Sequence, residues 1–120
     1  MKYMIMMFGD QAGMQETRSM EWIKEMIEFM GRLNDDLVAS GELVSAAGLA
    51  DASQAKTVRF ENGMPVATDG PYAEAKESLA GYWIVDVESE ARAIEIASRV
   101  VAFIECPVEL RQIMDAPPEV

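Results

Sequence analysis

The amino-acid sequence predicts an α+β protein in which an antiparallel sheet carries two helices on one face. Three observations predict this class. Two long segments repeat apolar residues at helical spacing, short apolar runs precede and follow them, and Asn62-Gly63 stands between two further short runs. A chain of 120 residues is typical of one domain. We expect that domain to span residues 1–115 and residues 116–120 to form a loose C-terminal tail.

The N-terminal part of the chain predicts a strand, a long helix and a second strand. Residues 3–8 are apolar and are followed by Gly-Asp, which indicates a short buried strand. Thr17 or Ser19 can cap a helix whose apolar residues recur every three or four positions, and Gly41 ends it. Residues 42–49 then form the second strand.

A β-hairpin is predicted for the middle of the chain. Residues 56–60 and 64–68 are short strand-like runs around Asn62-Gly63, the dipeptide best suited to a tight type I′ turn. Residues 69–80 form a connection, for which a helical turn over 74–79 is expected.

The C-terminal part predicts a strand, a helix and a last strand. Residues 81–87 are strongly apolar, which indicates a strand. Ser89 can cap a helix that runs to about residue 103, and Pro107 separates this helix from a strand over 108–114. The inward face of the helix is predicted to consist of Ile94, Ala97 and Val101.

This order of elements is that of a ferredoxin-like β-α-β-β-α-β fold with an inserted hairpin. Right-handed crossovers place both helices on one face of the sheet. Because strand residues alternate between faces, residues 3–8 and 81–87 are apolar on both faces, and two helices cover only one of them. Soluble monomers avoid such an exposed apolar patch, so a homodimer is expected. The alternative is a monomer whose hairpin or tail folds over that face.

The composition excludes several classes of function. A net charge of −11, from 10 basic and 21 acidic residues, lacks the positive footprint that nucleic acids and anionic membranes require. The apolar run at the N-terminus is too short for a signal peptide or a membrane span. Cys106 is the single cysteine, so an intrachain disulfide is impossible and a reducing compartment is favoured. We therefore expect a cytoplasmic protein that binds neither nucleic acid nor membrane.

The absence of histidine restricts the chemistry further. It removes the commonest general base and most zinc sites. The sequence also contains no phosphate-binding loop and no dinucleotide-binding fingerprint. The sequence therefore predicts no cofactor and no metal, and leaves carboxylates, Lys, Tyr and Cys as acid–base groups.

The most distinctive phrase runs from Asp69 to Glu77, with the sequence DGPYAEAKE. Turn chemistry explains Gly70 and Pro71 as structural turn residues. It does not explain an Asp, a Tyr, a Lys and two Glu within nine residues. The phrase is therefore the candidate functional site.

Each candidate residue has a structural alternative. Asp69 is the first choice for a catalytic proton-transfer or ligand-orienting residue, although a turn residue that bonds its own backbone is favoured. Tyr72 can donate a hydrogen bond to a substrate oxygen or pack at a cleft mouth. Lys76 can hold a substrate carboxylate or enolate, but a solvated helix charge is favoured. Arg59 and Arg111 lie on predicted strands. A side chain that points inward there indicates a substrate-binding anion site, and one that points outward indicates an ordinary surface charge.

The sequence resembles the YCII-related proteins, and within them the subgroup known for a DGPF phrase. The resemblance implies a dimeric α+β barrel whose relatives include isomerases, dehalogenase-like enzymes and monooxygenases of small molecules. Genes of this subgroup often lie beside sigma-factor genes, which implies a regulatory or accessory role. Tyr72 replaces the commoner Phe, residues 104–107 replace a glycine-rich stretch, and the His-Asp pair of some members has no counterpart here. Besides the phrase itself, the resemblance is carried by Lys2-Tyr3-Met4, Gly9-Asp10, Asn62-Gly63, Gly81-Tyr82, Asp86 and Glu109-Leu110-Arg111.

Two functions remain. The first is a homodimer that binds a small organic molecule near Asp69, with cofactor-free proton transfer on a carbonyl or phenolic compound as one option. A polar loop beside an apolar sheet is typical of a ligand pocket. The second is a non-catalytic accessory or regulatory module, associated with a sigma factor, that binds a protein partner. The first is favoured by analogy with related folds, and whether the protein is an enzyme stays open.

Overall fold

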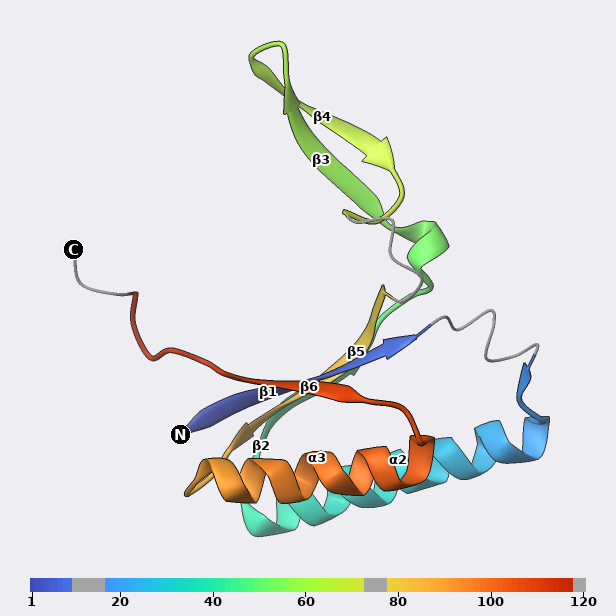
Figure 1. Ribbon diagram of the computed structural model, residues 1–120, viewed down its shortest axis with the longest axis vertical. Coiled ribbons are helices and arrows are strands. Elements are labelled where there is room, and N and C mark those ends of the chain that lie inside the picture. The colour runs from blue at the N-terminus through green and yellow to red at the C-terminus, as the bar shows by residue number, and fades with distance from the viewer. Residues whose placement is uncertain (10–16, 73–77, 118–120) are drawn as a thin grey trace.

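The computed structural model describes residues 1–9, 17–72 and 78–117. Nine elements make up these parts of the chain, and Figure 1 labels the helices and strands. In chain order they are β1 (Lys2–Gly9), α2 (Met20–Ser40), β2 (Leu43–Gly48), the short 3-10 helix η1 (Ala52–Gln54), β3 (Lys56–Glu61), β4 (Met64–Asp69), β5 (Ser78–Asp86), α3 (Glu90–Ile104) and β6 (Val108–Gln112).

Four strands form the main sheet in the order β2-β5-β1-β6, and every neighbouring pair is antiparallel. Both helices lie against one face of this sheet (Figure 1). The predicted α+β class and its ferredoxin-like arrangement are therefore confirmed. The two central strands, β1 and β5, are far apart in sequence and bring Ile5 opposite Trp83.

The hydrophobic core lies between the sheet and the helices. Tyr3 and Ile5 of β1 and Trp83 of β5 point toward the helices and are at most 4% exposed. Leu33 and Leu37 of α2 are fully buried against them. Burial of each such side chain stabilises the fold by roughly 1.5–3 kcal/mol.

Helix α2 begins and ends as its sequence indicates. Of the two predicted capping residues, Ser19 is the N-cap. Its side chain accepts a hydrogen bond of 3.0 Å from the backbone N–H of Trp22. Gly41 follows the helix with a φ of 78°, and its N–H donates to the carbonyls of Leu37 and Val38. This left-handed conformation costs glycine little, which explains why the helix ends here.

Helix α3 is capped by Ser89 as predicted, but it presents a different face to the sheet. Ile94 and Val101 are 51% and 36% exposed, so the prediction was wrong for both, and it was correct only for Ala97. The buried stripe is apolar at every helical position, whereas the stripe through Ile94 and Val101 also contains Ser98 and Glu105. The stripe with two alanines lets the helix approach the sheet closely. The buried residues of α3 are Ala93, Ile96, Ala97, Val100 and Ile104.

The boundaries of β5 and β6 also differ from expectation. Ser78 and Leu79 pair with Gly9 and Phe8 of β1, so β5 starts earlier than predicted and these residues are not helical. The remainder of the expected helical turn, residues 73–77, lies outside the described residues. The last strand, predicted to reach residue 114, ends at Gln112.

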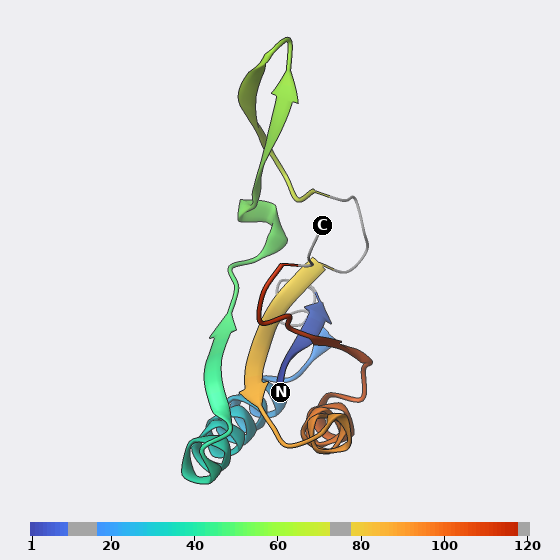
Figure 2. The ribbon, with the colours of Figure 1, turned by 90° about the vertical axis from the view of Figure 1, so that its left-hand side faces the viewer.

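Strands β3 and β4 form the predicted hairpin. Asn62 and Gly63 have φ angles of 50° and 80°, which are the two positive values that a type I′ turn requires. The two strands make a separate sheet and pair only with each other. Figures 1 and 2 show this hairpin extending away from the main sheet, on the side opposite the helices. We call residues 56–69 the hairpin arm.

The second face of the main sheet is not covered by helices. Alternation along β1 and β5 places apolar side chains there, opposite the buried Tyr3, Ile5 and Trp83. All of them are only half-buried within this chain. We call this surface the open sheet face; it consists of Met4, Met6, Phe8, Tyr82 and Ile84. Among the described residues, neither helix is long and apolar enough to cross a membrane.

Candidate functional site

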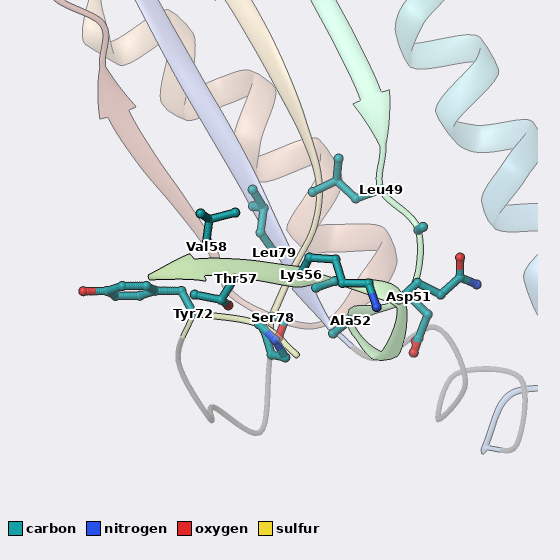
Figure 3. Close-up of a pocket in the computed structure, with 13 residues that line it drawn as sticks. Leu49, Asp51, Ala52, Lys56, Thr57, Val58, Tyr72, Ser78 and Leu79 are labelled. Carbon is teal, nitrogen blue, oxygen red and sulfur yellow. The ribbon is translucent and has the colours of Figure 1, made fainter. Parts of the chain in front are cut away.

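A cleft of about 690 Å³ opens where the hairpin arm joins the main sheet (Figure 3). Its walls come from the segment between β2 and β3, the root of β3, the turn after β4 and the start of β5. Most of the walls are apolar and consist of Leu49, Val58, Pro71, Leu79 and three alanines. The polar side chains around it are those of Asp51, Gln54, Lys56, Thr57, Tyr72 and Ser78.

One local and one long-range hydrogen bond fix the segment that precedes β3. The carboxylate of Asp51 caps η1 by accepting a bond of 3.0 Å from the backbone N–H of Ser53. The backbone N–H of Leu49 donates to the carbonyl of Ala80 at 2.8 Å, which ties the same segment to β5. The cleft wall is therefore held by a side-chain cap within η1 and by a backbone bond to β5.

The Asp-Gly-Pro turn is attached to the root of the arm. Gly70 has a φ of 104°, its N–H donates to the carbonyl of Ala55 at 2.9 Å, and its carbonyl accepts from Oγ1 of Thr57 at 2.7 Å. Thr57 is only 8% exposed, and it is the one polar side chain that is buried among the residues the structure describes. These bonds hold Pro71 and Tyr72 beside the cleft, which explains the structural part of the phrase.

Asp69 lies next to the cleft rather than in its wall. It faces Lys56 across the β3–β4 ladder, and the two side chains form an ion pair. The side chains are 88% and 65% exposed, so solvent screens the pair. Lys56, but not Asp69, is among the residues that line the cleft. Asp69 therefore contacts the site through Lys56.

Tyr72 lines the cleft and is 86% exposed. Figure 3 shows Tyr72 and Lys56 extending toward opposite ends of the cleft. The tyrosine hydroxyl and the lysine ammonium are thus hydrogen-bond donors at two separate, solvent-exposed edges of the cleft.

The remaining candidates are not brought together with these residues. Arg59 is exposed on the arm and, by strand alternation, lies on the face opposite Lys56 and Val58. Arg111 on β6 donates to Glu109 at 2.7 Å and is 74% exposed. Neither arginine lines the cleft. Lys76 lies outside the described residues.

A second charged cluster joins β2 to α3. Arg92 donates to both carboxylate oxygens of Glu42, at 2.9 and 2.8 Å, and to Glu95 at 3.1 Å. The hydrogen bond from Arg92 holds the pKa of Glu42 below its ordinary value, and the same bond raises the pKa of Arg92. Since Arg92 bonds both carboxylates and links the residue before β2 to the first turns of α3, this cluster is structural.

The sequence analysis missed Lys56 and Thr57 as cleft residues. A signal for both was available in the hairpin. With Asn62-Gly63 as the two turn residues, strand pairing places Lys56 opposite Asp69 and Thr57 opposite Thr68. The aliphatic walls contributed by Leu49 and Leu79 had no local signal, because they lie on separate elements that meet only in the folded chain.

The arrangement suits binding of a small organic molecule. Apolar walls with a few polar groups are typical of ligand pockets. Among the described residues, no group of three or more Asp, Glu, Cys or His side chains is placed to hold a metal ion. Acid–base chemistry in the cleft would depend on Lys56, Tyr72 and nearby carboxylates.

Comparisons with known proteins extend over nearly all of the chain, including the residues of the cleft. The family model described as the YCII-related domain matches residues 1–116. The chain is also 31% identical over 101 residues to an uncharacterized protein of Rhizobium meliloti (strain 1021), a match that covers 81% of this chain and 77% of that protein. Since the family match includes both helices, every strand and the cleft, the chain belongs to the YCII-related domain family.

Proposed function

We propose that this protein is a homodimer that binds a small organic molecule in the cleft at the root of the hairpin arm. The cleft itself is the observation that carries the proposal. Its volume of about 690 Å³ lies within the range of roughly 300–1,000 Å³ that is common for small-molecule sites. The phrase from Asp69 to Tyr72 beside it also supports membership of the DGPF subgroup.

The chemistry of the walls supports a ring-containing carbonyl or phenolic ligand. Leu49, Val58 and Leu79 suit an apolar ring, and Lys56 suits a phenolate, enolate or carboxylate oxygen. Tyr72 can donate to a second oxygen. Asp69 positions Lys56 through their ion pair, or accepts a proton from a ligand held by it. Proton transfer without a cofactor is the reaction type that these groups support.

The surface of the chain supports the homodimer. It exposes 8473 Å², whereas a compact monomer of 13.3 kDa exposes about 6,450 Å². Its radius of gyration is 16.6 Å, compared with about 13.6 Å for a compact domain of this length. The excess of roughly 2,000 Å² is larger than the roughly 800 Å² that each partner buries in a standard interface. Two copies stacked through the open sheet face would bury much of it.

Another surface favours the second function, a module that binds a protein partner. The N-terminal half of α2 carries a shallow apolar surface at Met20, Ile23 and Ile27. Met20 is 80% exposed and Ile27 is 63% exposed, and both lie away from the cleft. If this surface carries the function, Met20→Lys abolishes co-purification of the partner from cell extract while cleft variants do not. Co-purification that is unaffected by Met20→Lys contradicts this role.

The ligand proposal is tested by filling the cleft. Ala50 lines it and is exposed, so Ala50→Trp can occupy the cavity without disturbing the core. The probe is para-hydroxyacetophenone, which combines a ring, a ketone and a phenol. Binding is followed by shifts of the Lys56, Thr57 and Leu79 amide signals in two-dimensional NMR. We expect these shifts in the wild type and their loss in Ala50→Trp.

A matched control separates cavity filling from the effect of adding a tryptophan. Ala39 is exposed on α2, remote from the cleft, so Ala39→Trp leaves the shifts unchanged. Equal binding by wild type and Ala50→Trp would overturn the proposed site. Shifts that instead cluster on the open sheet face would place the probe elsewhere.

A further inference from the structure

Among the residues that the structure describes, few contacts hold the hairpin arm to the rest of its own chain. Its strands pair only with each other, and Figures 1 and 2 show it standing clear of the main sheet. The contacts at its root are Gly70 with Ala55 and Thr57, described above. A two-stranded hairpin is marginally stable in water without a packed face. The arm therefore needs a surface to lie against.

One face of the arm is apolar and continues the wall of the cleft. By the pairing register, Val58 lies opposite Ala67 and Phe60 opposite Pro65, all on the same side of the hairpin as Lys56. Val58 is 68% exposed and Phe60 is 77% exposed. Val58 also lines the cleft. We call these four residues, Val58, Phe60, Pro65 and Ala67, the apolar arm face.

The open sheet face and the arm lie on the same side of the molecule. The helices cover the opposite face of the sheet, and the arm rises on the uncovered side (Figure 1). A copy seated on the open sheet face would therefore stand beside the arm. The excess surface of the chain is large enough for both contacts.

Charge favours a second copy at these two surfaces over other parts of the protein. Each chain carries a net charge of −11, so two copies repel one another over most of their surface. The open sheet face and the apolar arm face contain no charged side chain. The charges that flank them on the same faces are Lys56 and Asp69 on the arm and Lys2, Asp86, Glu109 and Arg111 on the sheet. Lys56 pairs with Asp69, Arg111 with Glu109, and Asp86 with the N-terminal amine.

We propose that the arm of each protomer packs its apolar face on the second copy, and that the second copy thereby forms the missing wall of the cleft. The inference rests on the proposed homodimer and cleft, and it adds that each ligand site is complete only in the dimer. A two-fold axis makes the contact reciprocal, so that each arm holds the other protomer. Ligand binding and dimerisation are then linked, and each strengthens the other by the same factor.

Two matched substitutions at the end of the arm test this proposal in the full-length chain. Phe60→Lys places a charge on the apolar arm face, and Met64→Lys places the same charge on the other face. Both side chains are exposed within one chain, at 77% and 58%, so neither change threatens folding of the protomer. Dimerisation is measured by sedimentation, and binding by titration with para-hydroxyacetophenone.

We expect Phe60→Lys to weaken both dimerisation and probe binding by about tenfold or more, as the loss of a central interface contact does, and Met64→Lys to change neither. Saturating probe should tighten the wild-type dimer. A Phe60→Lys variant that dimerises like the wild type overturns the arm contact. A monomeric variant that binds the probe with wild-type affinity overturns the shared site and leaves the proposed function intact.

Amide hydrogen exchange tests the arm contact without any ligand. In the wild-type dimer, the amides of β3 and β4 should exchange slowly, and in Phe60→Lys they should exchange at the rate of an unprotected hairpin. Fast exchange of these amides in the wild type overturns the proposal, even if the probe binds. If the probe does not bind the wild type, slow exchange that Phe60→Lys abolishes still supports the arm contact.

Discussion

The indole Nε1 of Trp83 donates a hydrogen bond of 2.8 Å to Oδ1 of Asn34 and so connects the central strand β5 to helix α2. Trp83 is 4% exposed, and Asn34 is half-buried. The bond satisfies the polar atom of a side chain that otherwise fills the apolar core.

Replacing Asn34 by Ala should therefore destabilise the protein by about 1–2 kcal/mol, because it leaves a buried N–H without its partner. Urea denaturation followed by tryptophan fluorescence measures this loss. Asp35→Ala on the adjacent exposed position should change the free energy of unfolding by less than about 0.5 kcal/mol. Equal effects of the two substitutions would show that the hydrogen bond contributes nothing.

The ion pair of Glu42 with Arg92 should make stability depend on pH. The hydrogen bond from Arg92 lowers the pKa of Glu42 below its ordinary value of 4.5. A carboxyl group of this kind stabilises the fold above its ordinary pKa, and the contribution is lost as the pH falls through the lowered value. Glu42→Gln should therefore cost about 1–2 kcal/mol near neutral pH and progressively less below about pH 4.5.

Urea denaturation of wild type and Glu42→Gln at several pH values measures that difference. Glu95→Gln is the control, since Glu95 is 68% exposed and pairs with the same arginine. Its effect should stay below about 0.5 kcal/mol at every pH. A wild-type advantage that persists undiminished in acid would assign the stabilisation to packing of the side chain rather than to its charge.

Asp69→Asn should separate ligand binding from folding. Asp69 is 88% exposed, and an exposed ion pair contributes at most about 1 kcal/mol, so the melting temperature should fall by no more than about 4–6 °C. Probe binding should weaken several-fold because Lys56 is no longer positioned. Calorimetry and NMR titration measure the two effects. A large loss of thermal stability with unchanged binding would make Asp69 a structural turn residue.

A charge in the open sheet face should dissociate the proposed homodimer. Ile84 lies near the middle of that face, and Ile84→Lys removes an apolar contact and places a charge where two copies would meet. Ile94→Lys introduces the same change at an exposed position of α3. We expect the first variant to sediment as a monomer and the second as a dimer. A dimeric Ile84→Lys protein would exclude this face as the interface.

Local signals in the sequence predicted most of the fold, and each has a physical reason. Ser19 and Gly41 bound α2 because a hydroxyl accepts the free N–H at the start and a glycine takes the left-handed turn at the end. Asn62-Gly63 indicated the hairpin because both positions need positive φ. Such signals depend on neighbouring residues only, so they can be recognised without the tertiary structure.

The parts that were not predicted have two causes, local signals that were not recognised and contacts between distant segments. The face of α3 was predicted wrongly from Ile94 and Val101, which are exposed, although the uninterrupted apolar stripe lies on the other side of the helix. The cleft was identified only through its turn, because its walls come from elements that meet after folding. Lys56 was missed although the hairpin register around Asn62-Gly63 already places it opposite Asp69.

The position of β1 at the centre of the sheet has a consequence for synthesis on the ribosome. This first strand pairs with β5 on one edge and β6 on the other. The backbone of Met6 can therefore pair on one edge only after Tyr82 has been synthesised, and on the other only after Glu109. At roughly 5–20 residues per second, translation leaves an apolar segment without partners for several seconds. The nascent chain should therefore depend on chaperones that shield its N-terminal residues until the last strand emerges.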